Sequence, residues 1–165
     1  MEIRRKRFII AFINVLIILM AFFLRYGGIT FKIGQAVPIL LIPIVISISI
    51  FFGENATLLA ALLAGVLMDS ASADTSIFNT MFLLISSTAC SVMANRLLNR
   101  NLKAAVCLSA GFSFGYFAVK YLIFYVFGGV SVNYDYFVYY FIPSVLYTAV
   151  WIIPFYFLER KLSNY

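Results

Sequence analysis

Two charged side chains lie where the sequence is otherwise apolar, and they are the groups best placed to carry chemistry. Asp69 ends a run of small and apolar residues, and Lys120 lies inside a long apolar run. An isolated charge in membrane hydrocarbon costs at least about 2.5–3.5 kcal/mol on insertion scales, so such groups normally face protein and pair. We therefore predict that Asp69 and Lys120, expected at similar depth, form a charge pair inside a helical bundle. The alternative is that Lys120 extends to the headgroups while Asp69 caps a loop.

A charge pair of this kind serves either as a substrate or ion site or as a structural link between helices. Other polar residues in the apolar runs, Asn14 and the segment Ser86-Ser87-Thr88, fit both roles. Hydroxyl groups within helices commonly bond to their own backbone. We favour the structural role.

No residue set for catalysis or metal binding accompanies the pair. The sequence has no His, the side chain that most often serves as acid, base or metal ligand. It also lacks a Gly-x-Ser-x-Gly motif, an intramembrane carboxylate dyad and a phosphate-binding loop. Cys90 and Cys107 both lie in apolar runs and are expected to be small buried hydrophobes. We predict a protein that is not an enzyme and has no catalytic residues, cofactor or metal site.

The composition explains why charges are so few. Of 165 residues, 64% are hydrophobic and 11% are charged, with 12 Lys and Arg against 6 Asp and Glu. The mean hydropathy is +1.04. A soluble domain carries about a quarter charged residues, so this chain could not cover a water-exposed surface. A soluble globule, a disordered chain, a disulfide scaffold and a nucleic-acid binder are therefore excluded, and a multi-span membrane protein is predicted.

Six apolar runs come near or within the about 20 residues that a membrane helix needs. They cover residues 8–24, 37–52, 56–68, 76–93, 104–127 and 136–157. Pro38 suits a first helical turn, whereas Pro43 is expected to bend the second helix. The third run has 13 residues and rises only about 20 Å, short of a hydrocarbon core of about 30 Å. The predicted fold class is an all-α integral membrane protein, a six-helix transmembrane bundle forming one domain over residues 1–165.

Basic residues at the ends of the runs predict the orientation. Nine lie on the side of the N-terminus: Arg4, Arg5, Lys6, Arg7, Arg96, Arg100, Lys103, Arg160 and Lys161. Only Arg25 and Lys32 lie on the other side. Because short cytoplasmic segments carry the excess of Lys and Arg, both termini should be cytoplasmic. The inner loop Arg96–Lys103 is then expected to contact anionic membrane lipid, with an acidic cytoplasmic partner as the alternative.

Small residues recur at helical spacing and predict close helix packing. In the third run they are Ala56, Ala60, Ala61, Ala64 and Gly65. Gly111 and Gly115 form a similar pair in the fifth run. Small side chains let helix backbones approach closely, which drives helix association in lipid. We favour packing within the molecule, and a dimerisation face is the alternative.

The segment from the second to the fourth run resembles a known family. Pro38-Ile-Leu-Leu-Ile-Pro43 opens an apolar helix that ends Phe51-Phe52-Gly53-Glu54. A small-residue helix then ends Gly65-Val66-Leu67-Met68-Asp69, and Asn79 opens the next helix after a short polar loop. This pattern, with the length, the six-span layout and the basic N-terminus, resembles the MreD family of rod shape-determining proteins.

The resemblance implies a non-enzymatic scaffold subunit of the bacterial cell-elongation complex, in the cytoplasmic (inner) membrane, involved in cell shape and lateral peptidoglycan synthesis. The implied partners are an MreC-like protein with one span and a large external domain, the actin-like MreB, and RodA with its transpeptidase. The resemblance also implies a fold similar to the substrate-binding subunits of energy-coupling-factor vitamin transporters.

A substrate-binding subunit of such a transporter is therefore the alternative function. Those subunits usually dock on their membrane partner through an Ala-x-x-x-Ala in the first span. Here the first run has only Ala11 and Ala21, which are not so spaced. Those subunits also cover their ligand with longer external loops than the short loops expected here.

Overall fold

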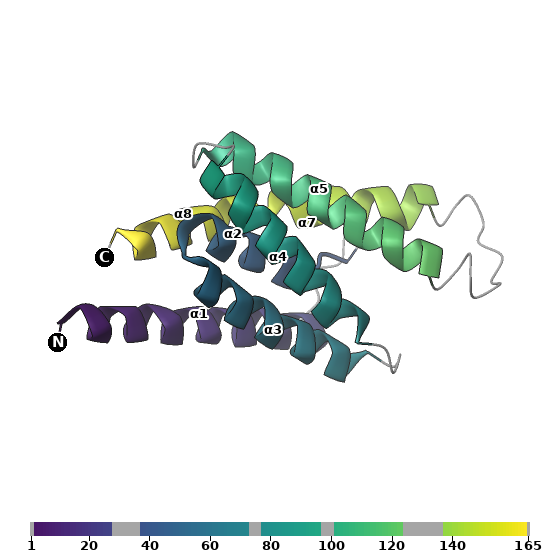
Figure 1. Ribbon diagram of the computed structural model, residues 1–165. Helices are drawn as coiled ribbons and strands as arrows, with labels where there is room; N and C mark the ends of the chain where they lie inside the picture. Colours follow the sequence, from purple (N-terminus) through teal and green to yellow (C-terminus); the bar gives the residue numbers. More distant parts are fainter. Residues whose placement is uncertain (1, 28–36, 73–76, 97–100, 124–136, 165) are drawn as a thin grey trace.

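The computed structural model describes residues 2–27, 37–72, 77–96, 101–123 and 137–164. Most of these residues are helical. In chain order they are α1 (Glu2–Tyr26), α2 (Leu41–Phe51), α3 (Glu54–Ala71), α4 (Phe78–Arg96), α5 (Leu102–Tyr121), the π-helical turn η2 (Phe137–Phe141), α7 (Ile142–Val150) and α8 (Ile152–Ser163). Both chain ends lie at the same end of the bundle (Figure 1). The predicted all-helical membrane fold is confirmed.

The core is built around α2, one of the shorter helices of the bundle. All residues from Leu41 to Ile50 are buried, and α2 packs against α3, α4, α5 and α8. A helix that is apolar on every side is either central or surrounded by lipid, and here it is central. Figure 1 shows it enclosed by the other helices.

The prolines of this region take different places from those predicted. Pro38 lies in the extended stretch before α2, and Pro43 is the third residue of the helix. The first N–H groups of a helix have no intrahelical partner, so proline costs little there. Because the helix begins later than the apolar run, Pro43 lies in its first turn and not in its interior, where the bend was predicted.

The prediction that the third helix is unusually short was also wrong. α3 has 18 residues and rises about 27 Å, close to the thickness of the hydrocarbon core. Its first turn includes Glu54, where a negative charge complements the helix dipole. Its last turn includes Asp69. Because both ends of the helix are polar, the apolar run is shorter than the helix itself.

The last expected span is interrupted. The turn η2 leads into α7, and a break at Trp151 separates α7 from α8. Pro143 and Pro154 each lie in the first turn of the helix that follows an interruption. Proline cannot continue an interior helical turn but is tolerated at a helix start, which accounts for both positions.

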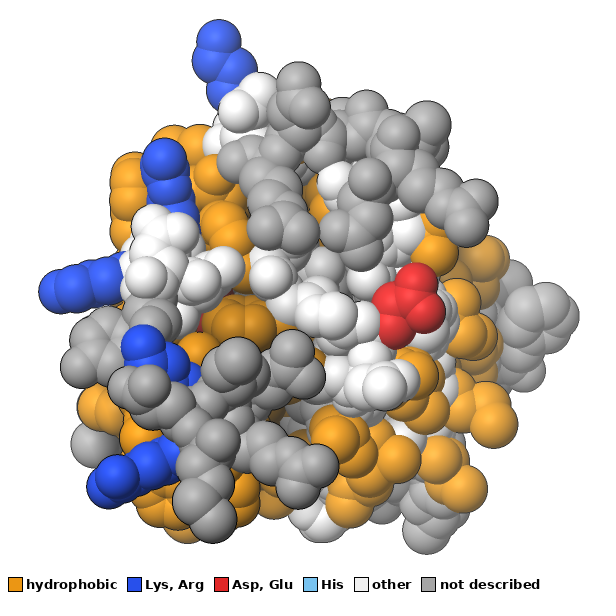
Figure 2. Space-filling view, turned by 60° about the vertical axis from the view of Figure 1, so that its left-hand side comes forward, with side chains coloured by type: hydrophobic (Ala, Val, Ile, Leu, Met, Phe, Trp, Pro, Cys, Tyr) orange, Lys and Arg blue, Asp and Glu red, His pale blue; other side chains and the backbone are white. Residues whose placement is uncertain are grey.

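The outer surface of the bundle is apolar. Among the described residues, four helical segments are long and apolar enough to cross a membrane: 8–26, 54–71, 102–121 and 139–163. The segments 41–51 and 78–94 are shorter apolar helices. Side chains of α1 such as Phe8, Met20 and Phe23 are more than 60% exposed. Figure 2 shows hydrophobic side chains on both sides of the molecule, and Lys and Arg side chains gathered along the left of the view.

Candidate functional site

Asp69 caps the start of α4 from the neighbouring helix α3. Its Oδ1 accepts a hydrogen bond from the backbone N–H of Asn79 at 3.0 Å. Its Oδ2 accepts from the backbone N–H of Thr80 at 2.9 Å and from the Thr80 hydroxyl. These N–H groups have no partner within α4, and a carboxylate also complements the positive end of the helix dipole. Because Ile77, which precedes α4, has no polar side chain, α4 takes its cap from another helix.

Gly65 lies one turn before Asp69 and contacts the same part of α4. A Cβ atom added to Gly65 would lie 2.4 Å from the Thr80 Cα and 3.0 Å from the Thr80 Oγ1. Only glycine therefore permits this approach of the two backbones. We call Gly65, Asp69, Asn79 and Thr80 the α3–α4 clamp. Gly65 lets the first turn of α4 come against α3, and Asp69 binds it there.

The other small residues of α3 differ in their surroundings. Ala60, Ala61 and Ala64 are buried inside the molecule, where α3 packs most extensively against α4. Ala56 is exposed at the start of α3. The stripe thus packs within one chain from Ala60 onwards.

The glycine pair of α5 does not act as a unit. Gly111 is exposed, and a Cβ atom there would meet nothing within 4 Å. At Gly115 a Cβ atom would make an ordinary contact with the Phe82 ring at 3.8 Å. Gly111 therefore does not have the packing role that was predicted for it.

Gly111 lines an apolar groove of about 420 Å³ together with Cys107. Cys107 is exposed rather than buried as expected, whereas Cys90 is buried.

Asn79 extends the clamp to α5. Its side-chain oxygen accepts a hydrogen bond from the Tyr116 hydroxyl at 2.6 Å, and its side-chain nitrogen lies 3.5 Å from the Ser72 hydroxyl. Tyr116 is 1% exposed. Its ring lies 5.7 Å and 5.3 Å, between centroids, from the rings of Phe78 and Phe82. One series of hydrogen bonds therefore joins α3, α4 and α5.

Lys120 lies one turn after Tyr116, and its ammonium is 5.9 Å from the centre of the Tyr116 ring. This distance permits a cation–π interaction. The carboxylate oxygens of Asp69 bind α4 instead, so the structure does not bring the predicted pair into direct contact. Asp69 and Lys120 lie at opposite ends of the series that runs through Asn79 and Tyr116. The sequence indicates the depth of a charge along its helix, but not the direction in which its side chain points.

Side chains from two other helices hold the extended stretch before α2. Nη1 of Arg25 donates to the Pro38 carbonyl oxygen at 2.8 Å. The backbone N–H of Ile39 donates to the Thr148 hydroxyl oxygen at 3.1 Å. Buried backbone outside a helix needs such partners, because an unpaired buried N–H or C=O group costs free energy. Arg25 and Thr148 therefore make this stretch compatible with burial.

A cavity of about 120 Å³ lies where α1, α5 and η2 meet, beside Tyr116. Its lining includes Arg25 and Lys120, together with aromatic side chains such as Tyr140 and Phe141. We call it the cationic cavity. No acidic side chain is among the described residues that line it.

A second polar contact joins α1 to α8 at the opposite end of the bundle. Glu159 is fully buried. With the amide nitrogen of Asn14 turned toward it, that nitrogen lies 3.2 Å from both carboxylate oxygens. Sequence analysis missed this contact because the sixth run was expected to end at residue 157. α8 continues to Ser163, so Glu159 belongs to the helix and not to a water-exposed flank.

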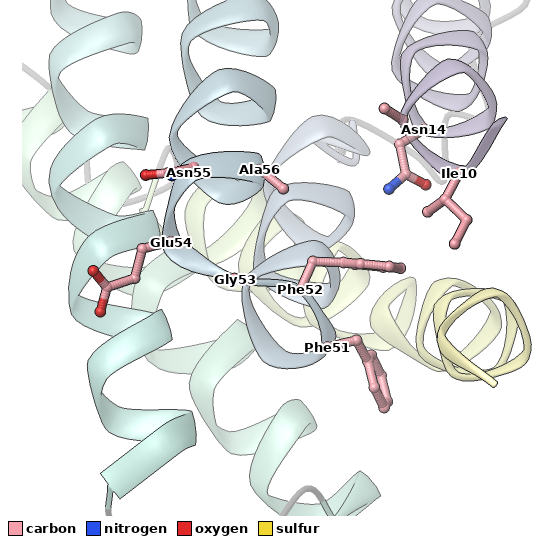
Figure 3. Close-up of a pocket in the computed structure, with 9 residues that line it drawn as sticks. Ile10, Asn14, Phe51, Phe52, Gly53, Glu54, Asn55 and Ala56 are labelled. Atoms are coloured by element: carbon pink, nitrogen blue, oxygen red, sulfur yellow. The ribbon is translucent and has the colours of Figure 1, made fainter. Parts of the chain in front are cut away.

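A cleft of about 690 Å³ opens beside Asn14, between α1 and the turn that joins α2 to α3. Figure 3 shows Asn14 and Ile10 on one wall and Phe52 and Ala56 on the other, while Glu54 points away from α1. Its lining combines apolar side chains with the two amides Asn14 and Asn55 and with Glu54. It brings no cluster of ionisable groups together.

The Asn14–Glu159 contact predicts a difference between two substitutions. Asn14→Leu removes the partner that the described residues provide for the buried carboxylate, and we expect it to destabilise the protein by about 1–3 kcal/mol. Glu159→Gln keeps an oxygen that can accept from Asn14 and should cost less. Thermal unfolding of the purified variants in detergent measures both. Equal melting temperatures for Asn14→Leu and the unchanged protein would show that the contact contributes nothing.

The polar side chains described above mainly hold helices to one another. Ser87 and Thr88 donate to the Leu84 carbonyl oxygen within their own helix, as expected for hydroxyls in apolar helices. Within the described part of the chain, no three His, Cys, Asp or Glu side chains are placed to hold a metal ion. The polar groups near Asp69 are used for helix capping and helix-to-helix contacts.

Comparison with known proteins identifies one family. The family model of rod shape-determining protein MreD matches residues 6–165, nearly the whole chain. No curated protein and no solved structure matches the chain.

Proposed function

This chain belongs to the rod shape-determining protein MreD family, and on that premise we propose that it is a non-enzymatic scaffold subunit of the bacterial cell-elongation complex. The family establishes a role in rod-shape determination as a membrane protein. The scaffold role within lateral peptidoglycan synthesis is our proposal. The observation that carries it is the use of the motif residues: Gly65, Asp69 and Asn79 hold α3, α4 and α5 together.

We propose a topology of six crossings with both termini in the cytoplasm. The position of both chain ends at one end of the bundle supports an even number of crossings (Figure 1). The nine basic residues predicted at that end support its cytoplasmic location. Of these, Lys103, Arg160 and Lys161 are exposed in the structure. The membrane is, on this proposal, the bacterial cytoplasmic membrane.

The proposed partners are an MreC-like single-span protein, and through it MreB, RodA and the transpeptidase that acts with RodA. The described residues reach little beyond the bundle, so partner helices would pack on its exposed apolar faces. α1 offers the most extensive face of this kind, with Phe8, Phe12 and Phe23 all more than half exposed. An exposed apolar helix face is compatible with both lipid and a partner helix.

The proposal predicts which proteins co-purify with the chain. We would purify a tagged chain from native membranes in mild detergent and identify its partners by mass spectrometry. The expected result is enrichment of a single-span protein with a large external domain, together with peptidoglycan synthases. Their loss from a Phe12→Glu variant of α1, compared at equal membrane level with a Lys161→Gln control, would place the contact on α1.

Two outcomes would contradict the proposal. Recovery of a membrane coupling subunit with paired ATPases would point to the transporter function instead. Normal rod shape in cells that lack this chain would exclude an elongation role, provided that no second MreD-family protein replaces it.

A further inference from the structure

We propose that the apolar groove between α4 and α5 binds an anionic phospholipid, with an acyl chain in the groove and the phosphate beside Lys103. This inference goes beyond the scaffold function and does not depend on it. It rests on the size and apolar lining of the groove and on the cation that lies at its end.

The groove, which we call the α4–α5 groove, has a volume of about 420 Å³. The described residues that line it are Met93 of α4 and, from α5, Ala104, Cys107, Leu108, Gly111 and Phe112. α4 and α5 follow each other in the chain, but α4 packs far more extensively against α3 than against α5. A Cβ atom on Gly111 would meet nothing within 4 Å, so the groove is open beside it. Apolar space of this kind is filled in a membrane, because an empty groove would lose van der Waals contacts.

The volume of the groove favours an acyl chain over a partner helix. A helix with its side chains is about 10–12 Å across, so about 420 Å³ holds only about one turn of it. The same volume of about 420 Å³ corresponds to about 14 groups of the size of water, at roughly 30 Å³ each. A methylene group is of similar size, so the groove accommodates much of one acyl chain.

Lys103 lies on the face of α5 that lines the groove. Lys103, Cys107 and Gly111 follow one another at four-residue spacing, which places them one above another along the helix. All three are exposed. Lys103 is the second residue of α5, at one end of the apolar segment 102–121. A lysine at such a position can extend its ammonium to the depth of the headgroups while its stem covers apolar surface. The groove therefore leads from the hydrocarbon to a cation at the membrane surface.

The first turn of α5 adds positive character beside Lys103. Asn101, which precedes the helix, makes no side-chain cap hydrogen bond, whereas Asp69 caps the first turn of α4. The first N–H groups of a helix have no intrahelical partner, and the helix dipole favours an anion there. Figure 1 shows this turn toward the end of the bundle where both chain ends lie, the end proposed to be cytoplasmic. Basic pockets between membrane helices on the cytoplasmic side commonly bind anionic lipid headgroups.

The test uses the full chain purified in detergent, with phosphatidylglycerol as the probe. Phosphatidylethanolamine of the same acyl chains, which has no net charge, is the reference lipid. Native mass spectrometry of mixed micelles counts the bound lipid. The exposed Cys107 reports on the groove through its rate of reaction with N-ethylmaleimide, and the buried Cys90 reports on unfolding.

Two substitutions separate the headgroup from the acyl chain. Lys103→Gln removes the cation, and its control, Lys161→Gln, removes the same charge from an exposed position of α8. Gly111→Leu fills the groove. Its control, Gly111→Ala, adds a single carbon atom where a Cβ atom meets nothing within 4 Å. Binding to the Gly111 variants is measured by mass spectrometry alone, because the added side chain lies beside Cys107.

We expect phosphatidylglycerol to bind the unchanged protein more tightly than phosphatidylethanolamine and to slow the reaction of Cys107. Lys103→Gln should weaken the binding of phosphatidylglycerol about fivefold, the effect of one cation near a membrane surface, and leave that of phosphatidylethanolamine unchanged. Gly111→Leu should weaken the binding of both lipids. Both control variants should bind as the unchanged protein does.

Three results would overturn the proposal. Equal binding of the two lipids by the unchanged protein would show that no anionic headgroup is recognised. Full binding of phosphatidylglycerol by Gly111→Leu would show that no acyl chain occupies the groove. Slowing of the Cys107 reaction by protein concentration, and not by lipid, would assign the groove to a second copy of the chain. If a variant does not fold, the comparison of the two lipids on the unchanged protein still decides.

Discussion

Replacing Gly65 with alanine is expected to destabilise the protein by about 3 kcal/mol or more. The added Cβ atom would lie 2.4 Å from the Thr80 Cα, and both are fixed to backbone rather than to flexible side chains. Overpacking of a core commonly costs about 1–3 kcal/mol when neighbours can adjust, and here whole helices would have to separate. Thermal unfolding in detergent measures the loss, and the yield of folded protein in membranes should fall in parallel.

Gly111→Ala is the matched control for this substitution. Gly111 is also a helical glycine of the bundle, but a Cβ atom there meets nothing within 4 Å. Alanine is favoured over glycine within a helix by about 0.5–1 kcal/mol, so this variant should be as stable as the unchanged protein or slightly more stable. If both variants unfolded at the same temperature, the folded protein would not contain the close approach at Gly65.

Asp69→Ala is expected to have the second-largest effect, a loss of about 1–3 kcal/mol. It removes the acceptor for two backbone N–H groups of α4 and for the Thr80 hydroxyl. Losing a helix cap costs about 0.5–2 kcal/mol, and buried donors left without partners add to this cost. Asp69→Asn keeps one acceptor oxygen and should give an intermediate melting temperature. Hydrogen exchange should increase at Asn79 and Thr80 in both variants.

Ser70→Ala is the control for this prediction, because Ser70 is exposed and donates only to the Leu67 carbonyl oxygen of its own helix. An Asp69→Ala protein as stable as Ser70→Ala would contradict the capping role. The Gly65 and Asp69 substitutions both act on Thr80, so their combined effect should be smaller than the sum of the single effects.

The all-helical fold and the order of the first five helices could be predicted from hydropathy, because an apolar run of sufficient length forms a helix in lipid. The division of the last run into η2, α7 and α8 was not predicted. The small residues from Ala60 to Gly65 likewise indicated a face for close packing. The central place of α2 could not be predicted, since a helix that is apolar on every side has the same sequence pattern in lipid and in a protein core. The length of α3 was underestimated because the apolar run, residues 56–68, ends before the polar residues at the two ends of the helix, among them Glu54 and Asp69.

Within the candidate site, Gly65, Asp69 and Asn79 could be selected from the sequence, but not their contacts. The partner of Asp69 depends on how α3 and α4 are turned about their axes, and spacing along one chain does not fix that rotation. Neither Tyr116 nor Glu159 could be recognised from the sequence as a residue of a polar contact. Tyrosine is common throughout this chain, with 11 copies, and Glu159 directly precedes the basic pair Arg160 and Lys161, which is typical of a water-exposed end.

The burial of α2 also bears on how this protein responds to its membrane. The 11 residues of α2 rise about 16 Å. This rise is only about half of a hydrocarbon core of about 30 Å. Since α2 has no lipid-facing side, a change in bilayer thickness reaches it only through the helices around it. α2 is thus a central helix without direct lipid contact, and the outer helices can change their tilt around it.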